Sequence, residues 1–186
     1  NLHSEIDQAF IALKKAVDDY WPISVETWQK FKLCCEFKKV DKGAILYGIG
    51  EVPQSFAFVY SGLFRLFILD EKGHEYNKMF FDEKSFPGSM SALLKNTPSL
   101  FSIDALEPSK IITINFSAYR RLLMEKEDLK IYHILYLEKN WLLAKDAREV
   151  EIVQEDASER YLRFLNDQAS IAARIPQYHL ASHLGI

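Results

Sequence analysis

Hydrophobic residues near the N-terminus recur at the three-to-four-residue spacing of one helix face. They are Ile6, Phe10, Leu13 and Val17. This spacing predicts a first helix that is capped by Ser4 with Asp7 and ends at Pro22. A second, shorter helix is predicted after the capping residue Ser24, and its hydrophobic face consists of Val25, Trp28 and Phe31.

From residue 37 onward the spacing changes to short runs rich in β-branched and aromatic residues. Turn residues separate these runs, and the predicted strands are residues 44–47, 56–60, 63–69, 75–81, 102–106 and 110–115. The turn at residues 70–73 predicts a hairpin, because Gly73 can adopt positive φ without steric cost. Many short strands at this spacing are typical of a sandwich or barrel-like β fold. A short helix within residues 86–94, started by the Pro87-Gly88 turn, interrupts the series.

Helical spacing returns after Phe116, first in a short helix that Ser117 caps and that runs to Met124. A long helix is then predicted over residues 129–153, and one hydrophobic stripe on it contains Tyr132, Leu135, Leu142 and Val150. The sequence offers no partner helix of similar length, so a single chain would leave this stripe in water. Pairing of the stripe with a second copy in a homodimer is favoured, and packing on the β domain is the alternative.

The C-terminal segment predicts two more helices. The first begins at residue 157, and the second begins near Pro176, which suits a first helical turn. Leu180, Ala181 and Leu184 form the apolar face of the second helix, and Gly185 is a natural residue to end it.

Composition narrows the class of protein. Hydrophobic residues make up 48% and charged residues 26% of the chain, which indicates a globular protein rather than a disordered one. The net charge of −3 provides no overall attraction to nucleic acid, so any contact with DNA must come from a local basic surface.

Cysteine usage and hydropathy indicate a cytoplasmic protein. Cys34 and Cys35 are the only cysteines, and they are interpreted as the half-buried end of a helix. Two adjacent thiols make no disulfide framework and are too few for a four-cysteine metal site, so a reducing compartment is expected. The sequence contains no apolar run long enough to span a bilayer and no signal peptide pattern, so no membrane partner is expected.

Three stretches of the sequence carry a resemblance, namely residues 40–46 (VDKGAIL) with Gly50, residues 58–66 (FVYSGLFRL) and residues 175–186. Together they resemble the Crp/Fnr transcription regulators of bacteria. The first is similar to that family's opening strand and turn, the second to its hairpin, and the third to the first helix and turn of its helix-turn-helix.

The resemblance implies an α+β fold with three segments. Residues 1–128 would form a cyclic-nucleotide-binding-like sensor, a jelly-roll-like β-roll of the double-stranded β-helix type flanked by helices. Residues 129–157 would form the dimerisation helix. Residues 158–186 would begin a winged helix-turn-helix, and its recognition helix would follow Ile186.

The predicted effector pocket departs from the family's nucleotide binders. Those proteins hold the cyclic phosphate at the N-terminus of the inserted helix and with a later Arg, and the carboxylate of a Gly-Glu pair contacts the ribose hydroxyl. The matching positions here are Gly88-Ser89 and Ser99. The candidate pocket residues are Gly88, Ser89, Met90, Ser99 and Leu100. Loss of such an Arg contact costs about 2–5 kcal/mol, so we expect no useful cAMP binding. A packed loop without ligand and a pocket for another small-molecule effector both stay open.

The C-terminal helix offers three candidate contacts to the DNA backbone, namely Arg174, Gln177 and Tyr178. The alternative is that these are ordinary surface residues. A dimer with complete DNA-binding units would read a two-fold site whose half-sites lie roughly 34 Å apart.

Searches for catalytic chemistry in the sequence find none. A phosphate-binding loop, a dinucleotide fingerprint and a nucleophile elbow are absent from it, so no enzyme activity or cofactor is expected. His179 and His183 have helical i, i+4 spacing but lack a third metal ligand, so no metal is predicted. The favoured function is DNA-binding transcription control. The alternatives are a sensor and dimerisation module without direct DNA binding, and a cupin-type enzyme, whose His and Glu cluster these strands lack.

Overall fold

Two antiparallel sheets lie at the centre of the computed structural model, which describes residues 1–184. One sheet has the strand order β1-β7-β3 and the other has the order β2-β6-β4-β5. The strands are β1 (Cys35–Val40), β2 (Ile45–Tyr47), β3 (Ser55–Ser61), β4 (Phe64–Leu69), β5 (Glu75–Phe81), β6 (Ser102–Ala105) and β7 (Ser109–Asn115).

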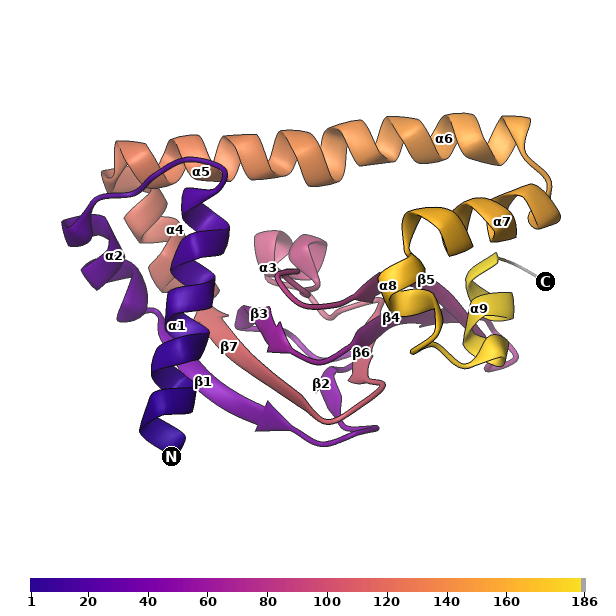
Figure 1. Cartoon of the computed structure of the whole chain (residues 1–186), viewed down its shortest axis with the longest axis horizontal. Coiled ribbons are helices and arrows are strands. Elements are labelled where there is room, and N and C mark those ends of the chain that lie inside the picture. The colour runs from indigo at the N-terminus through magenta and orange to yellow at the C-terminus, as the bar shows by residue number, and fades with distance from the viewer. Residues whose placement is uncertain (185–186) are drawn as a thin grey trace.

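Helices flank this roll at both ends of the chain (Figure 1). They are α1 (Leu2–Asp18), α2 (Val25–Lys32), α3 (Met90–Lys95), α4 (Phe116–Glu125), α5 (Glu127–Leu137), α6 (Ala144–Gln154), α7 (Ala157–Asp167), α8 (Ala169–Ala172) and α9 (Gln177–Leu184). A π-helical segment, Glu138–Leu143, joins α5 to α6. The predicted α+β roll with flanking helices is therefore confirmed.

Strand β3 is buried on both of its faces. Alternate side chains of a strand point to opposite faces of the sheet. Phe56 and Phe58 accordingly pack against the N-terminal helices, α4 and α5, while Ala57 and Val59 face the space between the sheets. This double burial explains why the sequence at β3 is continuously hydrophobic rather than alternating.

The hairpin predicted at residues 70–73 is present between β4 and β5. Gly73 has φ +83°, and the Asp70 side chain accepts hydrogen bonds from the backbone N–H groups of Lys72 and His74 at 2.8 and 2.9 Å. These bonds fix the turn and hence the register of the two strands.

Several predicted boundaries were wrong. The first helix begins at Leu2 with Asn1 as its cap, and Asn115 rather than Ser117 caps α4 by accepting from the Ala118 N–H. Cys35 opens strand β1 instead of ending a helix, because it pairs with Ile114 of β7. The inserted helix α3 is shorter than the predicted 86–94 segment.

A nearly continuous helix runs from Glu127 to Gln154 above the roll, confirming the predicted long helix (Figure 1). Its first half and the π-helical segment are attached to the residues that follow α1, because Tyr132 packs against Tyr20 and Asn140 donates a hydrogen bond to the Tyr20 hydroxyl at 2.8 Å. Its second half, α6, contains no buried residue. No helix of the described chain is long and apolar enough to cross a membrane.

Helices α7 to α9 turn back beneath the far end of the long helix and lie against β4 and β5 (Figure 1). Asp156 and Glu159 start α7 with a capping box. A third hydrophobic cluster joins these helices to the roll and contains Leu63, Phe164, Ile171, Ile175 and Leu180. The predicted role of Gly185 falls outside the described residues.

Candidate functional site

The predicted effector pocket is a packed junction in this structure. The segment before α3 lies along β3, where Ala57 N–H donates to the Pro87 carbonyl at 2.9 Å. A Cβ atom on Gly88 would lie 2.7 Å from the Phe56 Cβ, so only glycine fits this close approach. The backbone at Gly88 is therefore pressed against the core.

Two buried serines close the place where the family's nucleotide binders hold the phosphate. Ser89 and Ser99 are each 2% exposed, and their hydroxyl oxygens lie 2.7 Å apart. The Ser99 hydroxyl donates to the Phe101 carbonyl at 2.8 Å and accepts from the Phe101 N–H at 3.1 Å. Because its one proton is used, Ser89 must be the donor to Ser99. Every bonding position of Ser99 is filled by the chain itself.

The remaining pocket candidates are divided between core and surface. Met90 is partly buried and lines a cavity of about 30 Å³ among aromatic side chains that include Phe86, Tyr119 and Tyr136. This volume admits little more than a water molecule. Leu100 is 78% exposed, so its predicted place in the pocket was wrong. The loop turns it outward because Ser99, the residue before it, takes the inward position.

A larger hollow lies elsewhere, between α3 and α4. It encloses about 540 Å³ and is open to solvent. Among its lining residues are Arg120 and Arg121, which make no ion pair within the described residues. The sequence analysis did not identify this hollow.

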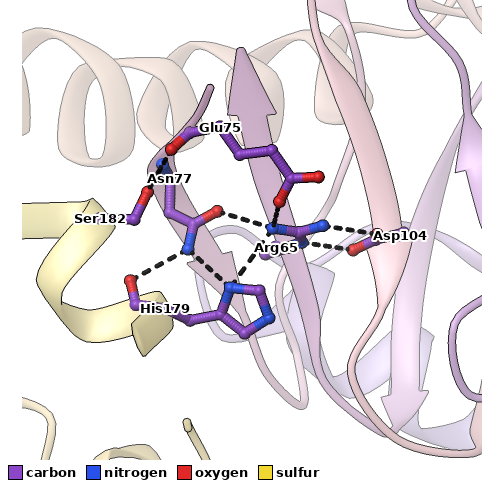
Figure 2. Close-up of polar contacts among 6 residues, drawn as sticks. All are labelled: Arg65, Glu75, Asn77, Asp104, His179 and Ser182. Atoms are coloured by element: carbon purple, nitrogen blue, oxygen red, sulfur yellow. Dashed lines mark hydrogen bonds and ion pairs between the residues drawn. The ribbon is translucent and has the colours of Figure 1, made fainter. Parts of the chain in front are cut away.

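An arginine in the middle of a hydrophobic strand forms the centre of a buried polar cluster (Figure 2). Arg65 of β4 is 7% exposed and pairs with Asp104 of β6 through two hydrogen bonds of 2.8 and 3.0 Å. It also donates to Glu75 at 2.5 Å and to the Asn77 side-chain oxygen at 3.2 Å. No local sequence pattern marks Arg65 as the centre of this cluster, because its partners are distant in the chain.

His179 of α9 completes this cluster from the C-terminal side (Figure 2). Its Nδ1 atom lies 3.3 Å from the Arg65 guanidinium and 3.0 Å from the Asn77 amide nitrogen, both of which are donors. Nδ1 must therefore be an unprotonated acceptor, and the ring proton is on Nε2. Burial and then the charge of Arg65 lower the pKa of His179 below its usual value, while Asp104 and Glu75 oppose this shift.

Helix α9 also covers the free edge of strand β5, which is the last strand of its sheet. The Ser182 hydroxyl accepts from the Asn77 N–H at 2.9 Å and donates to the Glu75 carbonyl at 2.7 Å. His183 Nδ1 lies 3.2 Å from the Asn77 carbonyl and must carry a proton to donate to it. The helix thus provides the hydrogen bonds that a neighbouring strand would otherwise supply.

The predicted DNA-backbone residues have different environments. Gln177 and Tyr178 are exposed. Arg174 is instead engaged with the roll, donating to Glu83 at 2.8 Å, to the Gly62 carbonyl at 3.1 Å and to Glu107. These carboxylates raise the pKa of Arg174. The expectation of a free phosphate-binding Arg174 does not hold in this arrangement, because two carboxylates already pair with it.

The predicted dimer stripe divides into a buried and an exposed half. Tyr132 is 3% exposed and packs against Tyr20 and Tyr136, so it belongs to the core of one chain and its predicted place in a dimer interface is wrong for this arrangement. Leu135 is partly buried, whereas Leu142 and Val150 are 58% and 53% exposed. Further exposed apolar residues on the same helix are Ile134, Leu137, Trp141, Leu143, Ile152 and Val153.

Metal-binding geometry is absent from residues 1–184, where no group of three or more His, Cys, Asp or Glu side chains could hold an ion. His179 and His183 instead contact the roll, as described above.

The β-roll matches one known family. Residues 37–126 match the family described as the cyclic nucleotide-binding domain. No curated protein sequence matches the chain.

Three solved bacterial structures illustrate the shared fold. The catabolite activator protein of Thermus thermophilus has a TM-score of 0.57 and 20% identity over 74% of this chain and 60% of that chain. The sensor domain of the transcriptional regulator DNR from Pseudomonas aeruginosa has a TM-score of 0.58 and 18% identity over 69% of this chain and 92% of that chain. The c-di-GMP responsive global regulator CLP from Xanthomonas campestris has a TM-score of 0.67 and 15% identity over 87% and 85%. The chain therefore spans less than two thirds of the Thermus protein, and at these identities the likeness concerns the fold.

The serine pair allows a specific prediction about stability. Ser99→Ala should lower the free energy of unfolding by about 1–3 kcal/mol, because the Ser89 hydroxyl and the Phe101 N–H both lose a partner. Ser89→Ala should cost less, since Ser99 keeps its two bonds to Phe101. The double variant should be little worse than Ser99→Ala alone in urea denaturation. Strictly additive losses would contradict a bonded pair.

Proposed function

We propose that this chain is the sensor and dimerisation part of a DNA-binding transcription regulator of the Crp/Fnr type, with a roll that does not bind cAMP. The order of elements carries the proposal. A cyclic nucleotide-binding domain is followed directly by a long helix with an exposed apolar half, and then by the helices α7 to α9. The solved regulators with this fold support the assignment.

The loss of cyclic-nucleotide binding is supported by the chemistry at the junction of Ser89 and Ser99. A cyclic phosphate needs a positive charge or free donors, and these two hydroxyls are occupied by each other and by Phe101. Opening the pair for a phosphate would break the bonds to Phe101 without supplying a cation. Binding would thus lose both the favourable charge contact and part of the loop's own hydrogen bonding.

The homodimer is supported by the apolar half of the long helix. Leu142 and Val150, with Trp141, Leu143 and Ile152, would stay in water in a single chain. Isolated exposed hydrophobic residues are normal, but a contiguous stripe marks an interaction surface. Two copies of residues 138–154, the π-helical segment with α6, in parallel would bury these side chains and place both C-terminal ends on the same side.

DNA contact is proposed for the segment that follows the long helix. Residues 158–186 would begin a winged helix-turn-helix, after the sensor at residues 1–128 and the dimerisation helix at 129–157. The exposed Gln177 and Tyr178 would contact phosphates, while Arg174 would first have to leave Glu83 and Glu107. Such a regulator would act on DNA in the bacterial cytoplasm, without a catalytic step or a cofactor.

Thermal melting tests the roll. A ligand at 100 times its dissociation constant adds about 2.7 kcal/mol to stability, so a functional nucleotide site would raise Tm by several degrees. We expect no change in Tm with millimolar cAMP or cGMP. The double variant Ser89→Glu with Ser99→Arg places the residues of the Crp/Fnr nucleotide binders at both positions. Its shift in Tm with cAMP serves as the comparison for any small shift in the unmodified protein. A clear shift in the unmodified protein would overturn this part of the proposal.

Sedimentation tests the dimer. The unmodified protein should sediment as a dimer at micromolar concentration, and Leu142→Glu and Val150→Glu should each weaken association at least about tenfold, because each buries two carboxylates per dimer. Leu33→Glu is a matched control, as Leu33 is 87% exposed on a different part of the chain. A monomer at all concentrations, or no effect at either helix position, would contradict the interface.

Selection from a random DNA pool tests the central proposal and separates it from its main alternative. The dimeric protein should enrich two-fold sites with half-sites roughly 34 Å apart, about one helical turn. Binding should weaken steeply with added salt, since phosphate contacts release counterions. A dimer that enriches no sequence would instead indicate a sensor module without direct DNA binding.

A further inference from the structure

The contact between α9 and the roll contains a chemical constraint that ordinary packing lacks. Its hydrophobic part, centred on Leu180 and Ile175, is insensitive to solution conditions such as pH. Its polar part depends on the protonation state of one ring nitrogen. The Nδ1 atom of His179 accepts from the Arg65 guanidinium and from the Asn77 amide, and neither of these groups can act as an acceptor toward it in this orientation.

We propose that α9 is held on the roll by a proton-sensitive latch centred on His179, and that proton uptake by this residue releases the helix from strand β5. A proton on Nδ1 would face two donors at about hydrogen-bond distance, and one of those donors carries a full positive charge. Both hydrogen bonds would be lost and replaced by repulsion. The docked arrangement therefore requires the neutral ring.

The charged surroundings of His179 come from three strands. Arg65 on β4 lies closest to Nδ1, and its own carboxylate partners are Asp104 on β6 and Glu75 on β5. These carboxylates favour a protonated His179, but each already accepts hydrogen bonds from Arg65. Burial and the nearby guanidinium outweigh them, so the pKa of His179 is lowered in the docked state.

A second histidine on the same helix behaves differently. His183 packs against the rings of Phe80 and Phe164, and its Nδ1 donates to the Asn77 carbonyl. Burial lowers its pKa, with Lys78 and Arg148 acting in the same direction and the Asn77 bond opposing it. Protonation of His183 keeps its hydrogen bond, whereas protonation of His179 removes two. His183 therefore adds to the pH dependence through its burial but breaks no hydrogen bond when protonated, so it serves as the comparison residue.

The direction of the pH effect follows from these pKa values. The released helix exposes His179, whose pKa then returns to about 6.5, while the docked state keeps it lower. Below about pH 6.5 the released state binds more protons, so docking weakens as the pH falls. Between the two pKa values, His179 alone lowers the docked-to-released ratio about tenfold per pH unit.

Release would uncover two surfaces together. The free edge of β5 would lose the bonds that Ser182 and His183 supply to its backbone. The helix that bears Gln177 and Tyr178 would be free to move relative to the roll. The consequence for DNA rests on the proposed function, whereas the release itself does not.

Hydrogen exchange of the whole chain, corrected for the intrinsic rate at each pH, tests the latch without DNA. From pH 7.5 to 5.5, the Asn77 N–H, which donates to Ser182, and the amides of residues 177–184 should lose protection together, while the core strand β3 keeps it. Retained protection at both segments, or loss of protection throughout the chain at once, would overturn the proposal.

Two variants assign the effect to a residue. His179→Asn places a non-titrating carbonyl oxygen near the position of Nδ1, so it should stay docked at pH 5.5. His183→Asn preserves a donor for the Asn77 carbonyl and should keep most of the pH dependence. If α9 is released in the His179→Asn variant at the same pH as in the unmodified chain, His179 is not the group that controls the release.

If the His179→Asn variant does not dock at any pH, a measurement on the unmodified chain still tests the latch. The ring signals of His179 can be titrated by nuclear magnetic resonance. Their midpoint should coincide with the loss of protection at β5. Protonation of His179 while β5 stays protected would show that the contact tolerates the charge and would overturn the latch. A failed DNA selection would leave these results unchanged, so the two proposals fail separately.

Discussion

The charge of Arg65 inside a hydrophobic strand is the constraint on which the sheet and the C-terminal helices jointly depend. Removing an ion from water costs several kcal/mol in proteins unless paired groups compensate for it. Asp104, directly opposite Arg65 in the register of β4 and β6, supplies one partner, and Glu75 supplies another from β5. The ring of Phe67 covers the guanidinium with its centroid 4.0 Å away. Asn77 of β5 and His179 of α9 are further neighbours of the Nη1 atom of Arg65, at 3.2 and 3.3 Å, so docking of α9 closes this side of the cluster.

Double burial of β3 explains how the rest of the fold is arranged around this cluster. One face of the strand contributes Ala57 and Val59 to the space between the sheets, and the other contributes Phe56 and Phe58 to the helices. A strand with two hydrophobic faces needs cover on both, which α1, α4 and the first half of the long helix provide. The second half of that helix contains no buried residue, and α7 contacts it through the ion pair of Arg163 with Glu151 at 3.0 Å. The anchored part of the long helix is therefore its first half.

Local signals predicted much of this architecture, and non-local pairing accounts for the errors. The strands after residue 44 were predicted because turns with fixed backbone requirements, such as the one at Gly73, separate them. Strand β1 was missed because its mixed polar pattern is that of an edge strand with little burial. Ser89 and Ser99 were identified as a departure from the family's motif, but their mutual hydrogen bond and the outward direction of Leu100 depend on how the loop folds. Arg65 gave no signal because Asp104 and His179 are 39 and 114 positions away.

The split environment of the long helix connects the roll with the C-terminal helices. Tyr132 fixes the helix to the core beside Tyr20. The π-helical segment begins six residues later and contains Asn140, which donates to the Tyr20 hydroxyl just after α1. A π-helical turn inside an α-helix often marks a functional site. Beyond it, the helix reaches the roll again only through α7 to α9, whose contacts consist of one hydrophobic cluster and the polar groups around Arg65 and Arg174. Because these two attachments lie at opposite ends of one helix, a change at either end must be taken up by the helix or by the weaker attachment. The attachment through α7 to α9 contains the titratable His179, so its strength can change with the pH of the solution.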